Sequence, residues 1–268
     1  MLYCGQKNGA IYMWNLKTDL EKTLTEARPH EVEEGEERVN LMITTMITMP
    51  KLQFMASGRM DGRLLLWDTI NSQRKFTYRG HSRGILSLAF NESMILLFSA
   101  GFDHKICIWN PYIETLIHKI EGHLSPILSL RVIEGTHQLI SMDSEGIVKV
   151  TDTRRFNIIS SFSVESDART GNGHAGSSPT APSNALSCFI TVSKPAKQML
   201  RLVFGGKSVA FYDYDKNYNP TTADEHPVIS CGYIKEHLSF YTPAGNKIKV
   251  WSALNGDVEK IYMDITSN

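Results

Sequence analysis

Histidine, serine and aspartate, the three residue types of a hydrolase triad, occur together in the middle of this chain. His81, Ser99 and Asp103 form one such set, and Trp109 follows them. An imidazole can take up a proton, a hydroxyl can attack a substrate, and a carboxylate can orient the imidazole. These residue types therefore raise the question of catalysis, and their recurrence along the chain bears on the answer.

The set is part of a repeat. Three segments align without gaps, and their final tryptophan or threonine recurs every 42 residues. They are MASGRMDGRLLLWD at 55–68, LFSAGFDHKICIWN at 97–110 and LISMDSEGIVKVTD at 139–152. A structural device is repeated in each unit, whereas an active site is not. We therefore expect no catalytic residue and no cofactor.

The residues at equivalent positions of the three aligned segments can be compared. The serine position holds Ser57, Ser99 and Ser141, the acid position holds Asp61, Asp103 and Glu145, and the last position holds Trp67, Trp109 and Thr151. A Gly-His pair, with His81 and then His123, stands 28 residues before Trp109 and Thr151. More degenerate copies flank this block, which makes six in all.

Short apolar runs separated by turn residues make up each copy. Examples are ILSLAF at 85–90, MILLFSA at 94–100 and KICIWN at 105–110. Runs of this length at even spacing are typical of all-β architecture. A period of about 40–45 residues with Gly-His and Trp-Asp signatures marks a propeller built of four-stranded sheets.

On these motifs the chain resembles the WD40-repeat β-propeller family. The resemblance implies a hydrogen-bonded tetrad in each blade, formed in the best copy by His81, Ser99, Asp103 and Trp109. It extends to Ser57, Asp61 and Trp67 in the preceding blade and to His123 and Ser141 in the following one. The following blade departs from the pattern at Glu145 and Thr151, and the last two blades carry Gly206 and Gly245 at the acid position.

We expect residues 1–268 to form a single propeller domain. Its blades would span approximately 1–25 (partial), 39–79, 82–121, 124–164, 185–222 and 226–265, with an acidic loop at 26–38 and a flexible insertion at 165–184. Because the first blade lacks its innermost strand, we expect an open ring, or a fragment of a longer protein that another segment closes. An open sheet edge exposes unpaired N–H and C=O groups.

The resemblance also implies where a partner would bind. Propellers of this family use the narrow face, where the residue before the tetrad acid is exposed; by position these residues are Met60, Phe102 and Ser144. Arg59 is adjacent, and Arg83 and Leu124 follow the Gly-His pairs. Because aromatic, Met and Arg side chains anchor interfaces, we expect Arg59, Met60, Arg83 and Phe102 to form one patch. The alternative is that Phe102 folds back against a neighbouring loop.

Composition excludes several function classes. Lys+Arg and Asp+Glu both number 28, so no global basic field attracts nucleic acid or membrane. The four cysteines are scattered and form no CxxC pair, which favours small core residues in a reduced, cytoplasmic compartment. No His/Cys/Asp cluster has metal-ligand spacing, and FGGKS at 204–208 lacks the rest of a phosphate-binding loop.

The sequence therefore predicts a non-enzymatic scaffold that binds proteins or peptides, with no small-molecule substrate. The alternative is an RNA-binding platform, because Lys194, Lys197, Arg201 and Lys207 are locally basic. A narrower resemblance concerns GFDHKICIWNPYIETLIHKIEGHLSPI at 101–127, which is similar to WD40 proteins of cilia and flagella. It implies a place in a larger cytoskeletal or ciliary scaffold.

Overall fold

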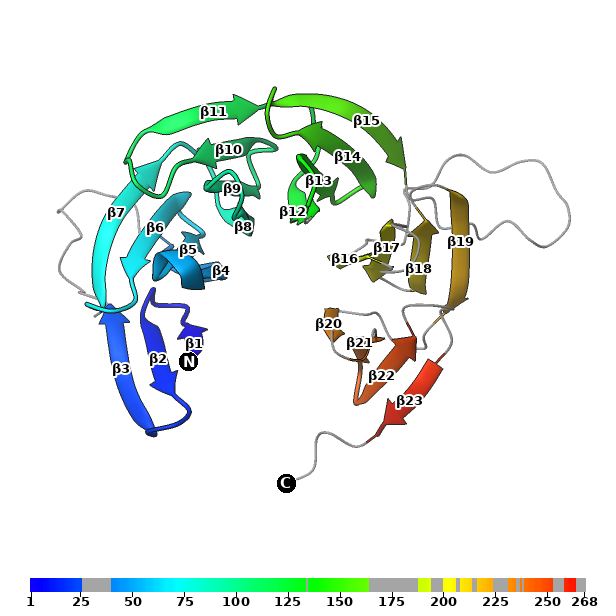
Figure 1. Ribbon diagram of the computed structural model, residues 1–268, viewed down its shortest axis with the longest axis horizontal. Helices are drawn as coiled ribbons and strands as arrows, with labels where there is room; N and C mark the ends of the chain where they lie inside the picture. Colours follow the sequence, from blue (N-terminus) through cyan, green and yellow to red (C-terminus); the bar gives the residue numbers. More distant parts are fainter. Residues whose placement is uncertain are drawn as a thin grey trace, which may run out of the picture. The chain divides into compact units, whose positions relative to one another are not determined.

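Strands make up almost all of the regular structure in the computed structural model (Figure 1). It describes residues 1–25, 40–133, 135–163, 188–193, 200–205, 208–213, 216–223, 231–234, 237, 239–252 and 258–263. Pro50–Leu52 form a short 3-10 turn, and His237 also has 3-10 geometry. The all-β prediction is therefore confirmed. The acidic loop at 26–38 and the insertion at 165–184 lie outside the described residues.

The chain divides into two compact units. The first consists of Met1–Asp143 and Lys149–Ser161, and the second of Ser144–Val148 and Phe162–Asn268. Six antiparallel sheets are described, one with three strands and five with four. Within each sheet the strands pair in sequence order, as short hairpin connections require.

The sheets of the first part of the chain are as follows. The three-stranded sheet consists of β1 (Leu2–Gly5), β2 (Ile11–Asn15) and β3 (Leu20–Thr25). The next consists of β4 (Ile43–Met49), β5 (Phe54–Arg59), β6 (Arg63–Asp68) and β7 (Gln73–Arg79). Then follow β8 (Ile85–Asn91), β9 (Leu96–Gly101), β10 (Ile106–Trp109) and β11 (Leu116–Ile120). The fourth sheet consists of β12 (Ile127–Ile133), β13 (Gln138–Asp143), β14 (Ile147–Asp152) and β15 (Asn157–Ser163).

The second unit holds the two remaining sheets. One consists of β16 (Cys188–Ser193), β17 (Leu200–Gly205), β18 (Ser208–Asp213) and β19 (Lys216–Ala223). The other consists of β20 (Gly232–Ile234), β21 (Ser239–Ala244), β22 (Lys247–Ser252) and β23 (Val258–Tyr262). The prediction of an open ring concerns the arrangement of both units and stays a prediction.

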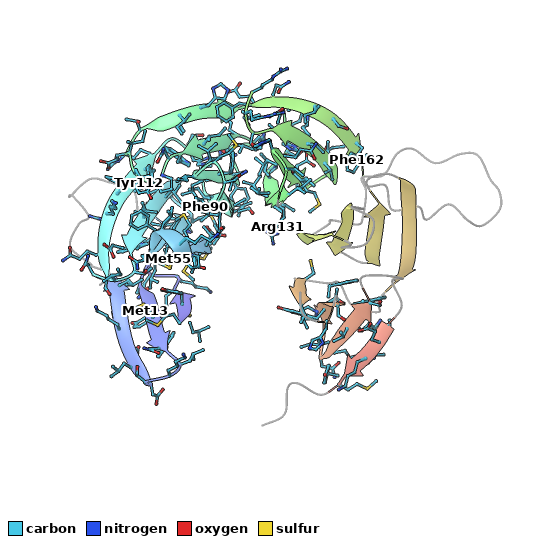
Figure 2. The ribbon with its side chains drawn as sticks, in the orientation of Figure 1. Met13, Met55, Phe90, Tyr112, Arg131 and Phe162 are labelled. Carbon is cyan, nitrogen blue, oxygen red and sulfur yellow. The ribbon has the colours of Figure 1, made fainter. Side chains whose placement is uncertain are left out.

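The first unit's core lies between neighbouring sheets. Its sheets follow one another in a fan, with β4, β8 and β12 on the inner side and β3, β7, β11 and β15 on the outer side (Figure 1). Met13 and Met55 (Figure 2) belong to one buried cluster shared by the first two sheets. A second cluster joins the second and third sheets and includes Tyr78 and Trp109. Burial of apolar area between sheets therefore holds the fan together.

Irregularities in the innermost strands repeat with the same period as the sequence. The register of β4, β8 and β12 shifts after Ile43, Ile85 and Ile127, respectively. Hydroxyl groups next to these shifts link one inner strand to the next. Thr44 Oγ1 donates to the Ile85 carbonyl, and Ser87 Oγ accepts the Leu130 N–H at 2.9 Å. Such bonds satisfy backbone groups that a bulged strand cannot pair within its own sheet.

Cysteine placement differs from the expectation in part. Cys107 is fully buried, and burial raises the pKa of its thiol to about 12, so it behaves as an inert core residue. Cys4 is exposed and Cys231 is half-buried. The prediction of core cysteines was therefore wrong for Cys4, because the edge strand β1 does not enclose it.

Candidate functional site

The structure brings His81, Ser99, Asp103 and Trp109 together between β9 and β10 and the loop before β8. His81 Nδ1 lies 2.8 Å from Asp103 Oδ2, and His81 Nε2 lies 2.7 Å from Ser99 Oγ. Trp109 Nε1 donates to the same Ser99 oxygen at 2.8 Å. A neutral imidazole protonated at Nδ1 satisfies all three contacts, since it donates to the carboxylate and accepts from the hydroxyl.

This tetrad is a structural hydrogen-bond network rather than a nucleophile with its general base. Ser99 is fully buried, and the indole N–H occupies the oxygen that a substrate would need. Asp103 also accepts the Lys105 N–H within the turn after β9 and the Ser82 N–H from the loop before β8. An unpaired polar atom at such depth would cost about 1–3 kcal/mol. The network therefore ties the loop before β8 to the β9–β10 hairpin.

Asp103 carries the negative charge of the network. Burial favours its protonated form, but hydrogen bonds from His81 and from the backbone outweigh burial, so the pKa of Asp103 lies below its ordinary value. A depressed folded-state pKa adds stability above the unfolded-state value of about 3.9, and this stability is lost as pH falls through the folded pKa.

We therefore expect Asp103→Asn to destabilise the protein at pH 7 by about 1–3 kcal/mol. The gap to wild type should narrow below pH about 4 as Asp103 takes up its proton. Urea unfolding at several pH values measures this, and Asp19→Asn, at an exposed turn position, is the matched control. A gap that stays constant down to pH 3 would contradict the role of the Asp103 charge.

The preceding sheet carries an incomplete set. Trp67 Nε1 donates to Ser57 Oγ at 2.9 Å, as in the tetrad. Asp61, however, lies 2.7 Å from the Arg59 guanidinium and accepts the Arg63 N–H at 3.0 Å. Asp61 thus closes its turn and neutralises an arginine, and no imidazole is paired with it among the described residues.

The fourth sheet corrects the sequence assignment of its acid. His123 Nδ1 lies 2.8 Å from Asp143 Oδ2, and His123 Nε2 lies 2.8 Å from Ser141 Oγ. Glu145, which alignment placed at the acid position, is exposed in the turn after β13. Ser141 and Asp143 are two residues apart in one strand and therefore point to the same face, which was the available signal. Thr151 stands in place of the tryptophan and is buried.

A further indole contact in the second unit was missed from the sequence. Trp251 Nε1 donates to Thr242 Oγ1 at 2.8 Å, and Trp251 stacks on Phe240 with ring centroids 5.9 Å apart. Thr242 stands nine residues before its tryptophan, whereas Ser57 and Ser99 stand ten before theirs. The shifted spacing hid the threonine from the alignment.

Three of the five predicted partner-binding residues meet at one edge of the first unit, and Arg59 and Ser144 are the exceptions. Phe102 N–H donates to the Gly84 carbonyl at 2.9 Å, and a Cβ on Gly84 would lie 2.6 Å from Met60 Sδ. Met60, Arg83 and Phe102 therefore surround the segment that enters β8. Arg83 is exposed, whereas Met60 and Phe102 are half-buried. We call these three residues the loop patch.

Arg59 does not belong to the loop patch. Its side chain is 10% exposed and pairs with Asp61, so it is not available to a partner. Burial lowers the pKa of Arg59 even beside that carboxylate. The reason is its position as the last residue of β5, a strand whose six residues are all buried. Ser144 falls in the second unit and is half-buried.

Leu124 occupies the loop that enters β12, which corresponds to the loop holding Ser82 and Arg83. It is 88% exposed, the highest value among the large apolar residues that the structure describes. Arg63 pairs with Arg79, so the entry loops lie at the same end of the strands as the β5–β6 turn. The edge therefore carries Leu124 in addition to the loop patch.

The described part of the chain offers little for other chemistry. No group of three or more His, Cys, Asp or Glu residues there could hold a metal ion. Nor does any helix in that part have the length and apolarity that crossing a bilayer requires. Lys194, Lys197 and Lys207, named for the RNA alternative, lie outside the described residues, and the Arg201 side chain is likewise not described.

Comparisons with known proteins agree with the repeat. The family model "WD domain, G-beta repeat" matches residues 72–110. Cilia- and flagella-associated protein 337 B of Tetrahymena thermophila is 52% identical over 266 residues, which are 99% of this chain. Nuclear distribution protein nudF 1 of Talaromyces marneffei is 30% identical over 130 residues, which are 47% of this chain and 26% of that protein. The chain spans about a fifth (19%) of the length of the ciliary relative.

A solved structure is similar in fold. A chain of the "Crystal Structure of Mitotic Checkpoint Complex" superimposes with a TM-score of 0.72 and 17% sequence identity. The match covers 94% of this chain and 71% of that one. At this identity the likeness concerns the propeller fold alone.

Proposed function

The chain belongs to the WD40-repeat β-propeller family, and from that premise we propose that it is a non-enzymatic scaffold that binds partner proteins or peptides. The loop patch and Leu124 provide the binding surface. The observation that carries the proposal is the exposure of Leu124, at 88%, on the edge where Arg83 is also exposed. Exposed apolar side chains rimmed by polar ones mark interaction sites on soluble proteins.

The same edge has the composition of an interface. Arg83 supplies a guanidinium, and Met60 and Phe102 supply adaptable and aromatic surface, which are the residue types enriched where proteins meet. The histidine, serine and aspartate groups that an enzyme would use are engaged in the hydrogen-bond networks described above. The net charge of zero supports a protein partner over an RNA partner.

Similarity to a cilia- and flagella-associated protein over 99% of this chain supports a ciliary place for the scaffold. We propose that this propeller is one module of a larger axonemal or cytoskeletal protein. Several modules on one chain would raise the effective concentration of each weak contact.

Partner binding should be lost when the edge is made acidic. We expect Arg83→Glu combined with Leu124→Asp to reduce recovery of partners from a ciliary extract at least tenfold, which corresponds to about 1.4 kcal/mol. Both side chains are exposed, so the fold should be unchanged. Quantitative pull-down with the immobilised chain measures the effect.

Leu16→Asp is the matched control. Leu16 is 72% exposed, but it lies in the β2–β3 turn at the opposite end of the strands. It should leave recovery within about twofold of wild type, since an isolated exposed substitution changes little. Equal recovery by all variants would remove this edge as the binding surface.

A further inference from the structure

Two arginines lie opposite each other in the second sheet. Arg63, the first residue of β6, pairs in register with Arg79, the last residue of β7. Arg79 is exposed and Arg63 is half-buried. Like charges directly opposite each other destabilise a sheet, so this pair weakens the sheet that contains it.

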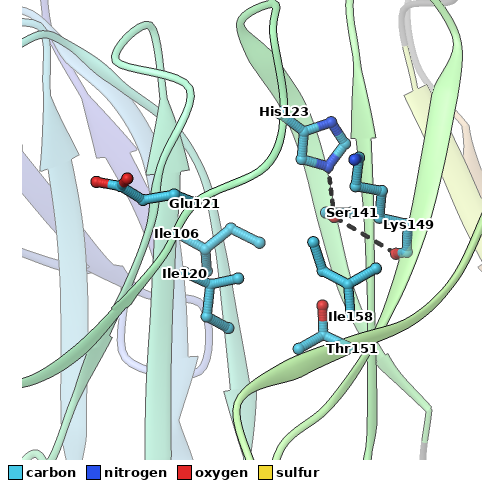
Figure 3. A pocket seen from close by; sticks show the side chains of 8 residues that line it. All are labelled: Ile106, Ile120, Glu121, His123, Ser141, Lys149, Thr151 and Ile158. Carbon is cyan, nitrogen blue, oxygen red and sulfur yellow. Dashed lines mark hydrogen bonds between the residues drawn. The ribbon is translucent and has the colours of Figure 1, made fainter.

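The third sheet has opposite charges at the equivalent positions. A shift of 42 residues leads from Arg63 to Lys105 and from Arg79 to Glu121. Lys105 Nζ lies 2.6 Å from Glu121 Oε1. Figure 3 shows the Glu121 carboxylate pointing away from the neighbouring isoleucine side chains. The second sheet therefore has a guanidinium where the third sheet has a carboxylate.

Arg83 brings a third guanidinium to the same end of the second sheet. It lies in the loop that enters β8, and it is exposed. A Cβ on Gly62 would lie only 2.8 Å from the Arg83 carbonyl oxygen, so this loop packs directly on the β5–β6 turn that precedes Arg63. We call Arg63, Arg79 and Arg83 the arginine cluster.

Within the described residues, Asp61 is the carboxylate that contacts the arginine cluster, and it is shared. Asp61 Oδ2 lies 3.6 Å from Arg63 Nε but 2.7 Å from the guanidinium of the buried Arg59. Arg79 and Arg83 form no ion pair with any residue that the structure describes. The arginine cluster thus carries an excess of positive charge, which an anionic group of another molecule can compensate.

We propose that the arginine cluster binds the carboxylate side chains of an acidic segment of a partner protein. This inference rests on the proposed function and specifies the chemistry of the partner. A guanidinium holds a carboxylate through two parallel N–H donors, and such charged pairs are stronger than neutral hydrogen bonds. Because Arg83 also belongs to the loop patch, apolar side chains of the same segment can pack on Met60, Phe102 and Leu124.

The extent of the arginine cluster favours a peptide over a nucleic-acid backbone. A phosphate backbone is bound along an extended basic track. In the third sheet, however, the positive charge of Lys105 is compensated by Glu121, and a further shift of 42 residues leads to the uncharged Ile147 and Ser163. The excess charge is therefore confined to one sheet, next to the exposed Leu124, which suits an acidic segment with an apolar residue.

The test measures how tightly the 268-residue chain binds a fluorescein-labelled peptide that has four consecutive glutamates beside a leucine. A matched peptide has glutamines in place of the glutamates. By fluorescence anisotropy, the glutamate peptide should bind at least about tenfold more tightly than the glutamine peptide. Added salt should weaken this binding, since the arginine cluster is at the surface.

The variant Arg79→Glu places in the second sheet the pairing of opposite charges found in the third. It should weaken binding of the glutamate peptide about tenfold. It should also raise the urea midpoint of unfolding, because it removes a contact between like charges, and this excludes loss of folding as the cause. Arg74→Glu is the matched control. Arg74 is exposed at the other end of β7, so the same change of charge there should leave binding within about twofold.

The chain's own acidic segment at 26–38 carries five glutamates between positions 31 and 37, and these can compete with the peptide. A variant with all five replaced by glutamine removes this competition. Equal binding of the two peptides by both wild type and this variant would overturn the proposal, as would unchanged binding after Arg79→Glu. An oligouridylate that binds more tightly than the glutamate peptide and competes with it would also overturn the proposal.

Failure of this inference is distinguishable from failure of the proposed function. If Arg83→Glu combined with Leu124→Asp loses its partners while the glutamate peptide does not bind wild type, the edge remains the binding surface and only the recognition of carboxylates is overturned. If the double variant keeps its partners, the proposed function fails, and the inference that rests on it fails as well.

Discussion

Replacing Trp109 with alanine should lower the free energy of unfolding of the first unit by about 3–5 kcal/mol. Trp109 is fully buried and packs on Tyr78 of the preceding sheet, so its removal opens a cavity between two sheets. It also removes the N–H that Ser99 accepts. Both losses act on the same contact, which joins the β4–β7 sheet to the β8–β11 sheet.

The measurement is urea unfolding followed by circular dichroism. Trp14→Ala is the matched control, because Trp14 occupies the same position of the β1–β3 sheet but is only half-buried, and Cys4 stands where the serine would be. It should cost no more than about 1 kcal/mol. Equal costs at the two positions would mean that burial between sheets is not what Trp109 contributes.

Trp109→Phe separates packing from hydrogen bonding. Phenylalanine keeps most of the apolar ring but has no N–H, so Ser99 loses one partner. We expect this variant to fall between wild type and Trp109→Ala, with a cost of about 1–2 kcal/mol.

The repeat predicted the fold because three copies share one register without gaps. Trp67 and Trp109 were expected in strands, and they lie in β6 and β10, the third strands of their sheets. Because each copy has the same hairpins at the same spacing, a strand located in one copy predicts the position of the matching strand in the next. The all-β architecture and the propeller family were therefore accessible from the sequence.

The details of each network were less accessible, because an acid at the end of a strand and one two residues later in the following turn can exchange roles. Asp143 replaces Glu145 as the partner of His123, and the equivalent of Asp143 in the preceding sheet is Gly101. A Cβ on Gly101 would lie 2.0 Å from the Gly84 carbonyl oxygen, so that position excludes any side chain there. Alignment reports matching positions but not the space around them.

Arg59 failed as a surface prediction for a similar reason. Arg59 was placed in the predicted patch because it is adjacent to Met60, which lies in the turn after β5. Arg59 is instead the last residue of β5, whose six residues are all buried, and Asp61 compensates its charge at 2.7 Å. A buried guanidinium is retained only when a carboxylate accompanies it, and the pair is two residues apart in the sequence.

The acid of the fourth sheet can be identified by removing each candidate. Asp143→Ala leaves the buried His123 Nδ1–H without its acceptor, and we expect a loss of about 2–4 kcal/mol in the free energy of unfolding. Glu145→Ala, two residues further along, removes an exposed side chain and should change stability by less than about 0.5 kcal/mol. Urea unfolding of both variants measures the difference.

A double-mutant cycle that combines each acid substitution with His123→Ala measures the interaction of that acid with His123. It removes other effects of each substitution from the comparison. Asp143 and His123 are in contact, so their substitutions should couple by about 1–3 kcal/mol, whereas Glu145 and His123 should be additive within about 0.5 kcal/mol. Coupling between His123 and Glu145 would instead mean that Glu145 is the acid, at the same distance in sequence from its histidine as Asp103 is from His81. A coupled Asp143 means that this sheet keeps its histidine anchored although Thr151 stands in place of the tryptophan.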